Sequence, residues 1–228
     1  MEVKKTDDQL FPPPVSDLLT ALSATGFFEE SLLIGSWVMP LYGEFFDISY
    51  VLRTMDIDFA VQLLQRAKTQ TSDLQDIIVS QGFTPFITQS GIQKFSREGF
   101  TIEFIIHRRG GRDEDPVLVH RWNITAIPLP FVNILVDFSF VVQCPGYKVR
   151  APIPEAFFLQ KLITASRRAG ETKRLKDLEQ CAVIGPKLDQ SRLDNVCSSI
   201  KLGSSTWKAV KSSCEAIDFP LQKLGIRK

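Results

Sequence analysis

Two aspartates separated by one isoleucine interrupt an apolar run in the first third of the chain, Asp56-Ile57-Asp58-Phe59. The apolar neighbours predict a strand over Asp56–Val61. Successive side chains of a strand point to opposite faces, so we expect both carboxylates on one face, about 7 Å apart. Two such charges on an apolar strand repel each other unless a cation lies between them. The pattern therefore predicts a sheet that carries a magnesium (or manganese) site.

A third carboxylate, Glu103, lies in a run of β-branched and aromatic residues, Phe100–His107. A glutamate in the middle of a strand is rarely buried without a partner. If this strand lies beside Asp56–Val61, Glu103 can face the same point as the two aspartates. Three convergent carboxylates can hold two divalent cations about 3.5–4 Å apart, the spacing used for in-line attack on phosphorus. The alternative is that Glu103 lies at a sheet edge and is merely solvated.

Composition excludes several classes of protein. Of 228 residues, 44% are apolar and 23% charged, as in an ordinary globular protein. The N-terminal lysines are not followed by the apolar segment of a signal peptide, and the longest apolar stretch, residues 127–142, is broken by prolines and too short to span a bilayer. The four cysteines form no CxxC pair, so we expect reduced, mostly buried thiols in a cytoplasmic protein.

The two parts of the chain differ in charge. Residues 1–147 hold 11 Lys and Arg against 18 Asp and Glu, whereas residues 148–228 hold 16 against 8. This asymmetry would suit a protein that places metal ions on one lobe and anionic groups against the other. Solvated helix faces of unequal sign explain the counts as well.

The order of elements predicts a mixed α/β (α+β) sheet domain, residues 1–152, followed by a helical domain, residues 153–228. In the first domain we expect helices near residues 16–26, 37–42 and 71–81, a loop at 43–50, and strands at 31–34, 56–61, 83–88, 92–97, 100–107, 116–120, 132–142 and 147–151. In the second we expect helices at 155–169, 173–184, 188–200 and 206–217.

The order of these features resembles the DNA polymerase β-type nucleotidyltransferase superfamily. The resemblance rests on Ile34-Gly35-Ser36, then Asp56-Ile57-Asp58, then Glu103 in an apolar strand. The phrases Gly-Ser-Trp and Arg-Thr-x-Asp-Ile-Asp are similar to a bacterial branch distantly akin to the toxin nucleotidyltransferases of abortive-infection systems. The resemblance covers roughly residues 30–185. One departure is the 19 residues between Ser36 and Asp56, more than the superfamily's usual gap, which affects the course of residues 43–50.

The resemblance implies roles for these residues. The two aspartates would hold the metal ion that carries the triphosphate, and Glu103 would join them around a second ion and help to deprotonate the attacking hydroxyl. Gly35 would let the backbone approach the phosphates, and Ser36 would donate hydrogen bonds to them. Arg53 would pair with a phosphate or brace the strand, and the sequence does not separate these two roles.

The helical half carries a second group of candidates. Lys161 and Arg168 share a helix face, and Lys176 and Asp177 follow on the next expected helix. The order of these residues resembles the helical half of the same bacterial branch, where such residues complete the nucleotide cleft. Lys161 is then the first candidate for a triphosphate contact, with Lys176 and Asp177 behind it. A solvated basic face is the alternative.

Three functions remain open. The first is a metal-dependent nucleotidyltransferase that moves NMP from an NTP to a hydroxyl on RNA, a protein or a small molecule. The second is a two-metal nuclease, which commonly needs Glu-x-Lys where this chain has Glu103-Phe104-Ile105. The third is a non-catalytic nucleotide-binding or toxin–antitoxin interaction module. The two histidines, Asp137 and the charged loop 108–112 are weaker site candidates.

Overall fold

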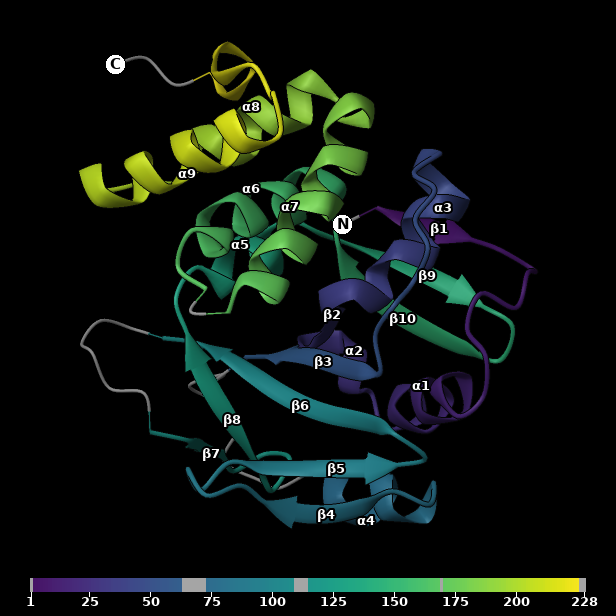
Figure 1. The fold of residues 1–228 in the computed structure, drawn as a ribbon. Helices are drawn as coiled ribbons and strands as arrows, with labels where there is room; N and C mark the ends of the chain where they lie inside the picture. Colours follow the sequence, from purple (N-terminus) through teal and green to yellow (C-terminus); the bar gives the residue numbers. More distant parts are fainter. Residues whose placement is uncertain (1, 63–72, 109–114, 169, 226–228) are drawn as a thin grey trace. The chain divides into compact units, whose positions relative to one another are not determined.

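The computed structural model describes residues 2–62, 73–108, 115–168 and 170–225 (Figure 1). The chain divides into two compact units. Residues 1–40 and 52–152 form the first unit, and residues 41–51 and 153–228 form the second. The short segment 41–51 therefore belongs with the helical unit, although it lies within the first quarter of the sequence.

A mixed, branched sheet forms the centre of the first unit (Figure 1). Its strands are β2 (Leu32–Ile34), β3 (Asp56–Val61), β4 (Thr84–Ile87), β5 (Gln93–Arg97), β6 (Phe100–His107), β7 (Val117–Val119) and β8 (Ile124–Leu129). The main order is β2-β3-β6-β5-β4. Strand β3 runs parallel to β6 along one edge, while β5 pairs with the first part of β6 and β8 with its last part.

One face of β3 and β6 is buried by aromatic rings. Phe59 and Phe104 are register partners whose rings stack at 5.8 Å between centroids. Phe27 meets both of them edge-on, at 5.5 and 6.2 Å. Because side chains alternate along each strand, burial of this aromatic face fixes which residues lie on the opposite face. A shift of the strand register by one residue would bury carboxylates in place of the aromatic rings.

Helices and a second sheet complete the first unit. The helical segments are α1 (Val15–Ala24), α2 (Phe27–Glu30), the 3₁₀ turn η1 (Gly35–Val38), α4 (Leu74–Ser80) and α5 (Val132–Asp137), and the sheet consists of β1 (Val3–Lys5), β9 (Ser139–Cys144) and β10 (Tyr147–Pro152). Strand β9 lies between β1, to which it is parallel, and β10, to which it is antiparallel. Helix α1 is tied to β10 by a 2.9 Å bond from the Lys148 amide to the Ser23 hydroxyl.

The second unit is a helical bundle around α6 (Figure 1). Its elements are α6 (Pro154–Ala165), α7 (Glu171–Ile184), η2 (Gly185–Lys187), α8 (Gln190–Ser198), α9 (Ser204–Ala216) and η3 (Leu221–Leu224). Most side chains of α6 are buried, as expected for a central helix. Segment 41–51 is held to this bundle by an edge-to-face contact of Tyr42 with Phe157 and by an ion pair between Asp47 and Lys187.

The expected α/β sheet followed by helices is confirmed, but several details of the prediction are wrong. Residues 132–142 do not form one strand, because α5 ends at Asp137 before β9 begins. The segment expected to be a loop from residue 43 begins as helix, since α3 (Met39–Phe46) continues through Gly43. Strands β1 and β8 and the short helix α2 were not predicted. Part of the expected helix at 71–81 and the end of that at 155–169 lie outside the described residues. No helix in the described part of the chain is long and apolar enough to cross a membrane.

Candidate functional site

The register of β3 and β6 places the predicted carboxylates on one face of the sheet. Asp58 is the register partner of Glu103, and Asp56 that of Thr101. Residues in register on neighbouring strands share a face, and so do residues two apart on one strand. Asp56, Asp58 and Glu103 therefore lie on the face opposite the stacked Phe59 and Phe104 rings. Asp56 is exposed, and the other two are partly buried.

Gly35 makes the space that Asp58 occupies. Strand β2 pairs antiparallel with β3, and Ile34 is the register partner of Asp58. Gly35 is the next residue after Ile34. A Cβ built on Gly35 would overlap Oδ2 of Asp58 and lie 3.1 Å from its Cγ. Gly35 also has a φ of +68°, in the left-handed region that side chains disfavour. Gly35 is thus packed directly against Asp58, and Ser36 is buried in η1.

The structure adds a residue that sequence analysis missed. Lys94 of β5 forms an ion pair through Nζ with Oε1 of Glu103, and both side chains are about one-fifth exposed, at 22% and 21%. The two strands are antiparallel, with Phe95 opposite Ile102, and the same register carries Lys94 opposite Glu103. The sequence does contain an indication of this pair, because the Glu98-Gly99 turn between the two predicted strands sets the register that brings Lys94 opposite Glu103.

The carboxylates fit a divalent cation in their chemistry and their common face. Oxygen donors are the ligands that Mg²⁺ takes in proteins, and the space given to Asp58 beside Gly35 is one that any larger residue would close. As the side chains stand, however, no three Asp, Glu, His or Cys residues of the described chain are arranged to hold a metal ion. Asp56 and Asp58 have the oxygen donors and the shared sheet face that such an ion would need, while Glu103 is engaged by Lys94 through Oε1.

The other predicted phosphate ligand of this unit, Arg53, is exposed in the segment just before β3. The weaker candidates are dispersed. His107 ends β6, His120 is exposed after β7, and Asp137 is an exposed residue at the end of α5 rather than in the middle of a strand. Residues 109–112 of the charged loop lie outside the described part of the chain.

In the helical unit, Lys161 and Asp177 are buried and paired. Asp177 Oδ1 accepts from Lys161 Nζ, and Oδ2 accepts from Arg168 Nε at 2.9 Å. Burial alone would raise the pKa of Asp177, but the charges and hydrogen bonds of Lys161 and Arg168 outweigh it and hold this pKa below its usual value. The carboxylate thus orients both cations. Lys176 lies one residue earlier on α7 and is partly exposed.

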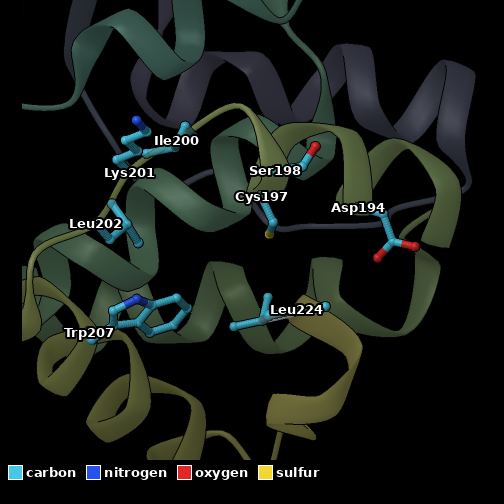
Figure 2. A pocket seen from close by; sticks show the side chains of 9 residues that line it. Asp194, Cys197, Ser198, Ile200, Lys201, Leu202, Trp207 and Leu224 are labelled. Atoms are coloured by element: carbon cyan, nitrogen blue, oxygen red, sulfur yellow. The ribbon is translucent and has the colours of Figure 1, made fainter. Parts of the chain in front are cut away.

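A cavity of about 540 Å³ lies in the helical unit near α8, α9 and η3. Figure 2 shows the Trp207 ring and Leu202 at one end and the Asp194 carboxylate at the other, with Cys197 between them. Burial, aided by Asp194, raises the pKa of Cys197 to about 12. None of the predicted site residues lines this cavity, so it is separate from the candidate site.

Comparisons with known proteins agree with this architecture. A family model described as nucleotidyltransferase (NTP_transf_8) matches residues 14–200. Among solved structures, an antigenic nucleotidyltransferase-like protein from Paracoccidioides brasiliensis is 15% identical with a TM-score of 0.52, covering 92% of this chain and 93% of that chain. The antibiotic-resistance factor ANT(2'')-Ia is 12% identical with a TM-score of 0.39, covering 88% and 90%. A search of curated proteins found no match. The expected fold is confirmed by the first structural likeness.

Proposed function

The chain belongs to the nucleotidyltransferase family NTP_transf_8, and from this premise we propose that it transfers NMP from an NTP to a hydroxyl acceptor. The acceptor is RNA, a protein or a small molecule. The family match bears out the expectation of an enzyme of this class. The metal requirement and the roles of individual residues are our proposal.

One observation carries the proposal: the Asp58 carboxylate is packed on Gly35 while it shares a sheet face with Asp56 and Glu103. A glycine and a serine that open a turn can present backbone N–H groups to phosphate oxygens. Here that turn is built directly against the residue proposed to hold the cation. The phosphate-binding element and the carboxylates are therefore held together by packing within one unit.

Asp56, Asp58 and Glu103 are the residues that would hold Mg²⁺ or Mn²⁺. Such a cation, when bound, neutralises charge on the triphosphate and polarises the phosphorus. Gly35 admits the phosphates close to the backbone, and Ser36 donates to their oxygens. Arg53 pairs with a phosphate or braces the strand.

In the proposed reaction, the acceptor hydroxyl oxygen attacks the α-phosphorus. A new O–P bond forms there, the bond between the α-phosphorus and its bridging oxygen breaks, and pyrophosphate leaves. Glu103 takes the proton of the attacking hydroxyl and passes it to solvent.

Lys161, Lys176 and Asp177 are the proposed nucleotide-binding residues of the helical unit. A direct contact of Lys161 with the triphosphate would break its buried pair with Asp177. An indirect role of Lys161 would keep that pair intact. Asp177 would then hold Lys161 and orient Arg168, whose side chain is 37% exposed. Lys176 is then the direct contact among the three.

The test is incubation of the protein with each labelled NTP, Mg²⁺ and a cell extract as the source of acceptor. We expect label to pass to one class of acceptor, and we expect Asp58→Asn to abolish the transfer. Glu98→Gln, in the exposed turn between β5 and β6, is the matched control and should transfer label as the wild type does. Transfer that survives Asp58→Asn would exclude this mechanism.

The alternative is a non-catalytic nucleotide-binding or toxin–antitoxin module on the same scaffold. It predicts that NTP binds to the wild type with no transfer of label to any acceptor. Equilibrium binding of a labelled NTP, measured beside the transfer assay, separates the two functions.

A further inference from the structure

The Lys94–Glu103 pair places a fixed positive charge on the acidic face of the sheet. The ammonium group contacts one oxygen of Glu103, the carboxylate whose register partner is Asp58. Both partners are about four-fifths buried, so the pair is shielded from solvent more than an exposed ion pair is. Lys94 is therefore an internal counter-ion for the residue that the proposed function assigns to the metal.

A cation that takes Glu103 as a ligand competes with this ammonium. The carboxylate oxygen that accepts from Lys94 cannot at the same time present its full charge to Mg²⁺, and two positive charges within a few ångströms repel each other. A metal ion that binds Glu103 through this oxygen must therefore displace Lys94 from it.

We propose that Lys94 is a positioning residue that holds Glu103 in place without metal and sets the metal concentration at which the carboxylates load. This inference rests on the proposed function, because it takes Glu103 as a metal ligand. Lys94 is not a catalytic residue in this account, since its contact is with Glu103 and not with a reacting atom.

The test is equilibrium binding of Mn²⁺ alone to the full chain, read from the electron paramagnetic resonance signal of the free ion. Lys94→Met removes the charge and keeps most of the length of the side chain. We expect it to lower the half-saturating Mn²⁺ concentration about two- to fivefold, the range for loss of one ion-pair competitor. Lys94→Arg keeps the charge and should bind Mn²⁺ as the wild type does. Lys148→Met, an exposed lysine of β10, is the control for loss of any lysine and should leave binding unchanged.

Tighter Mn²⁺ binding by Lys94→Met would distinguish a positioning role of Lys94 from structural damage, because a variant with a disordered site would bind the metal less well. Unchanged or weaker Mn²⁺ binding by Lys94→Met, with wild-type binding intact and lost in Asp58→Asn, overturns the role of Lys94 and leaves the proposed function standing. Absence of Mn²⁺ binding by the wild type overturns both. If Lys94→Met fails to fold, Lys94→Gln carries the same expectation.

Discussion

Oδ2 of Asp58 lies where a residue other than glycine at position 35 would place its Cβ. The two residues are 23 positions apart in sequence but adjacent in the sheet, because β2 and β3 pair antiparallel with Ile34 opposite Asp58. The glycine thus sets the position of a proposed metal ligand as well as opening the turn that carries Ser36.

Gly35→Ala should remove NMP transfer almost completely. The new methyl group must displace the Asp58 carboxylate, and a misplacement of about 1 Å at a reacting centre can cost about 100-fold in rate. The left-handed φ adds a stability cost of about 1–2 kcal/mol. Steady-state transfer rates and urea unfolding measure the two effects separately.

Gly146→Ala is the matched control for this prediction. Gly146 has a φ of +81°, similar to that of Gly35, but a Cβ there meets no atom within 4 Å. It should lose a similar amount of stability and keep transfer within about twofold of wild type, because backbone strain alone does not move the site. Equal loss of activity in both variants would show that Asp58 is not positioned by Gly35.

Phe104→Ala should lower the free energy of unfolding of the first unit more than a substitution on the exposed edge of the sheet does. The ring is buried and stacked on Phe59, so removing it costs about 3–5 kcal/mol. Phe86→Ala on β4, where the side chain is 41% exposed, should cost less than about 1 kcal/mol. Denaturant midpoints measure both, and similar midpoints would contradict the assignment of this face as the core.

Asp177 should make the helical unit sensitive to acid. Its pKa in the folded chain lies below the value of about 4 in an unfolded chain, so its contribution to stability is complete above about pH 4 and is lost as the pH falls through the folded value. At pH 7, Asp177→Asn should cost roughly 3 kcal/mol by leaving Lys161 with a weaker buried partner.

The cost of Asp177→Asn relative to wild type should shrink below pH 4, measured by urea unfolding at several pH values. Glu179→Gln, at an exposed position of the same helix, should change stability by less than about 0.5 kcal/mol at pH 7. A cost of Asp177→Asn that stays constant down to pH 2 would contradict the pairing.

The cysteines should react slowly with thiol reagents in the folded protein. Burial raises the pKa of Cys181 well above its usual value and those of Cys197 and Cys214 to about 12, and Cys144 is buried. Thiolates are therefore scarce at pH 8. All four should react within seconds after unfolding in guanidinium. A fast-reacting thiol at Cys144, Cys181 or Cys214 in the native protein would contradict the burial of these three side chains.

The β3 and β6 strands were predictable because apolar alternation and three interrupting carboxylates, Asp56 and Asp58 in β3 and Glu103 in β6, mark both their positions and their faces. The helices of the second half were predictable from the helical spacing of apolar residues that begins at Pro154. The helix α5 and strand β9 within residues 132–142 could not be told apart in this way. Their residues form one continuous apolar run, and such a run does not show the periodicity that distinguishes a short helix from a strand. The pairing of Lys94 with Glu103 depends on strand register, which sequence sets only through the Glu98-Gly99 turn.

The pairing within the helical unit was the harder part to predict. The resemblance implied a nucleotide-binding role for Lys161 and Asp177, which stays a prediction, but nothing in the sequence indicated their pairing with each other, because contacts between α6 and α7 depend on the packing of apolar side chains elsewhere on both helices. A lysine on a predicted helix face gives no sign of which carboxylate it will meet.

The most direct test of the metal-site proposal is a crystal structure of the chain soaked in Mn²⁺, with anomalous differences measured at the manganese edge. The account predicts an anomalous peak bound by Asp56 and Asp58, with the Glu103 carboxylate turned from Lys94 toward it. Well-ordered carboxylates with no anomalous peak beside them, at a Mn²⁺ concentration that supports label transfer, would contradict it.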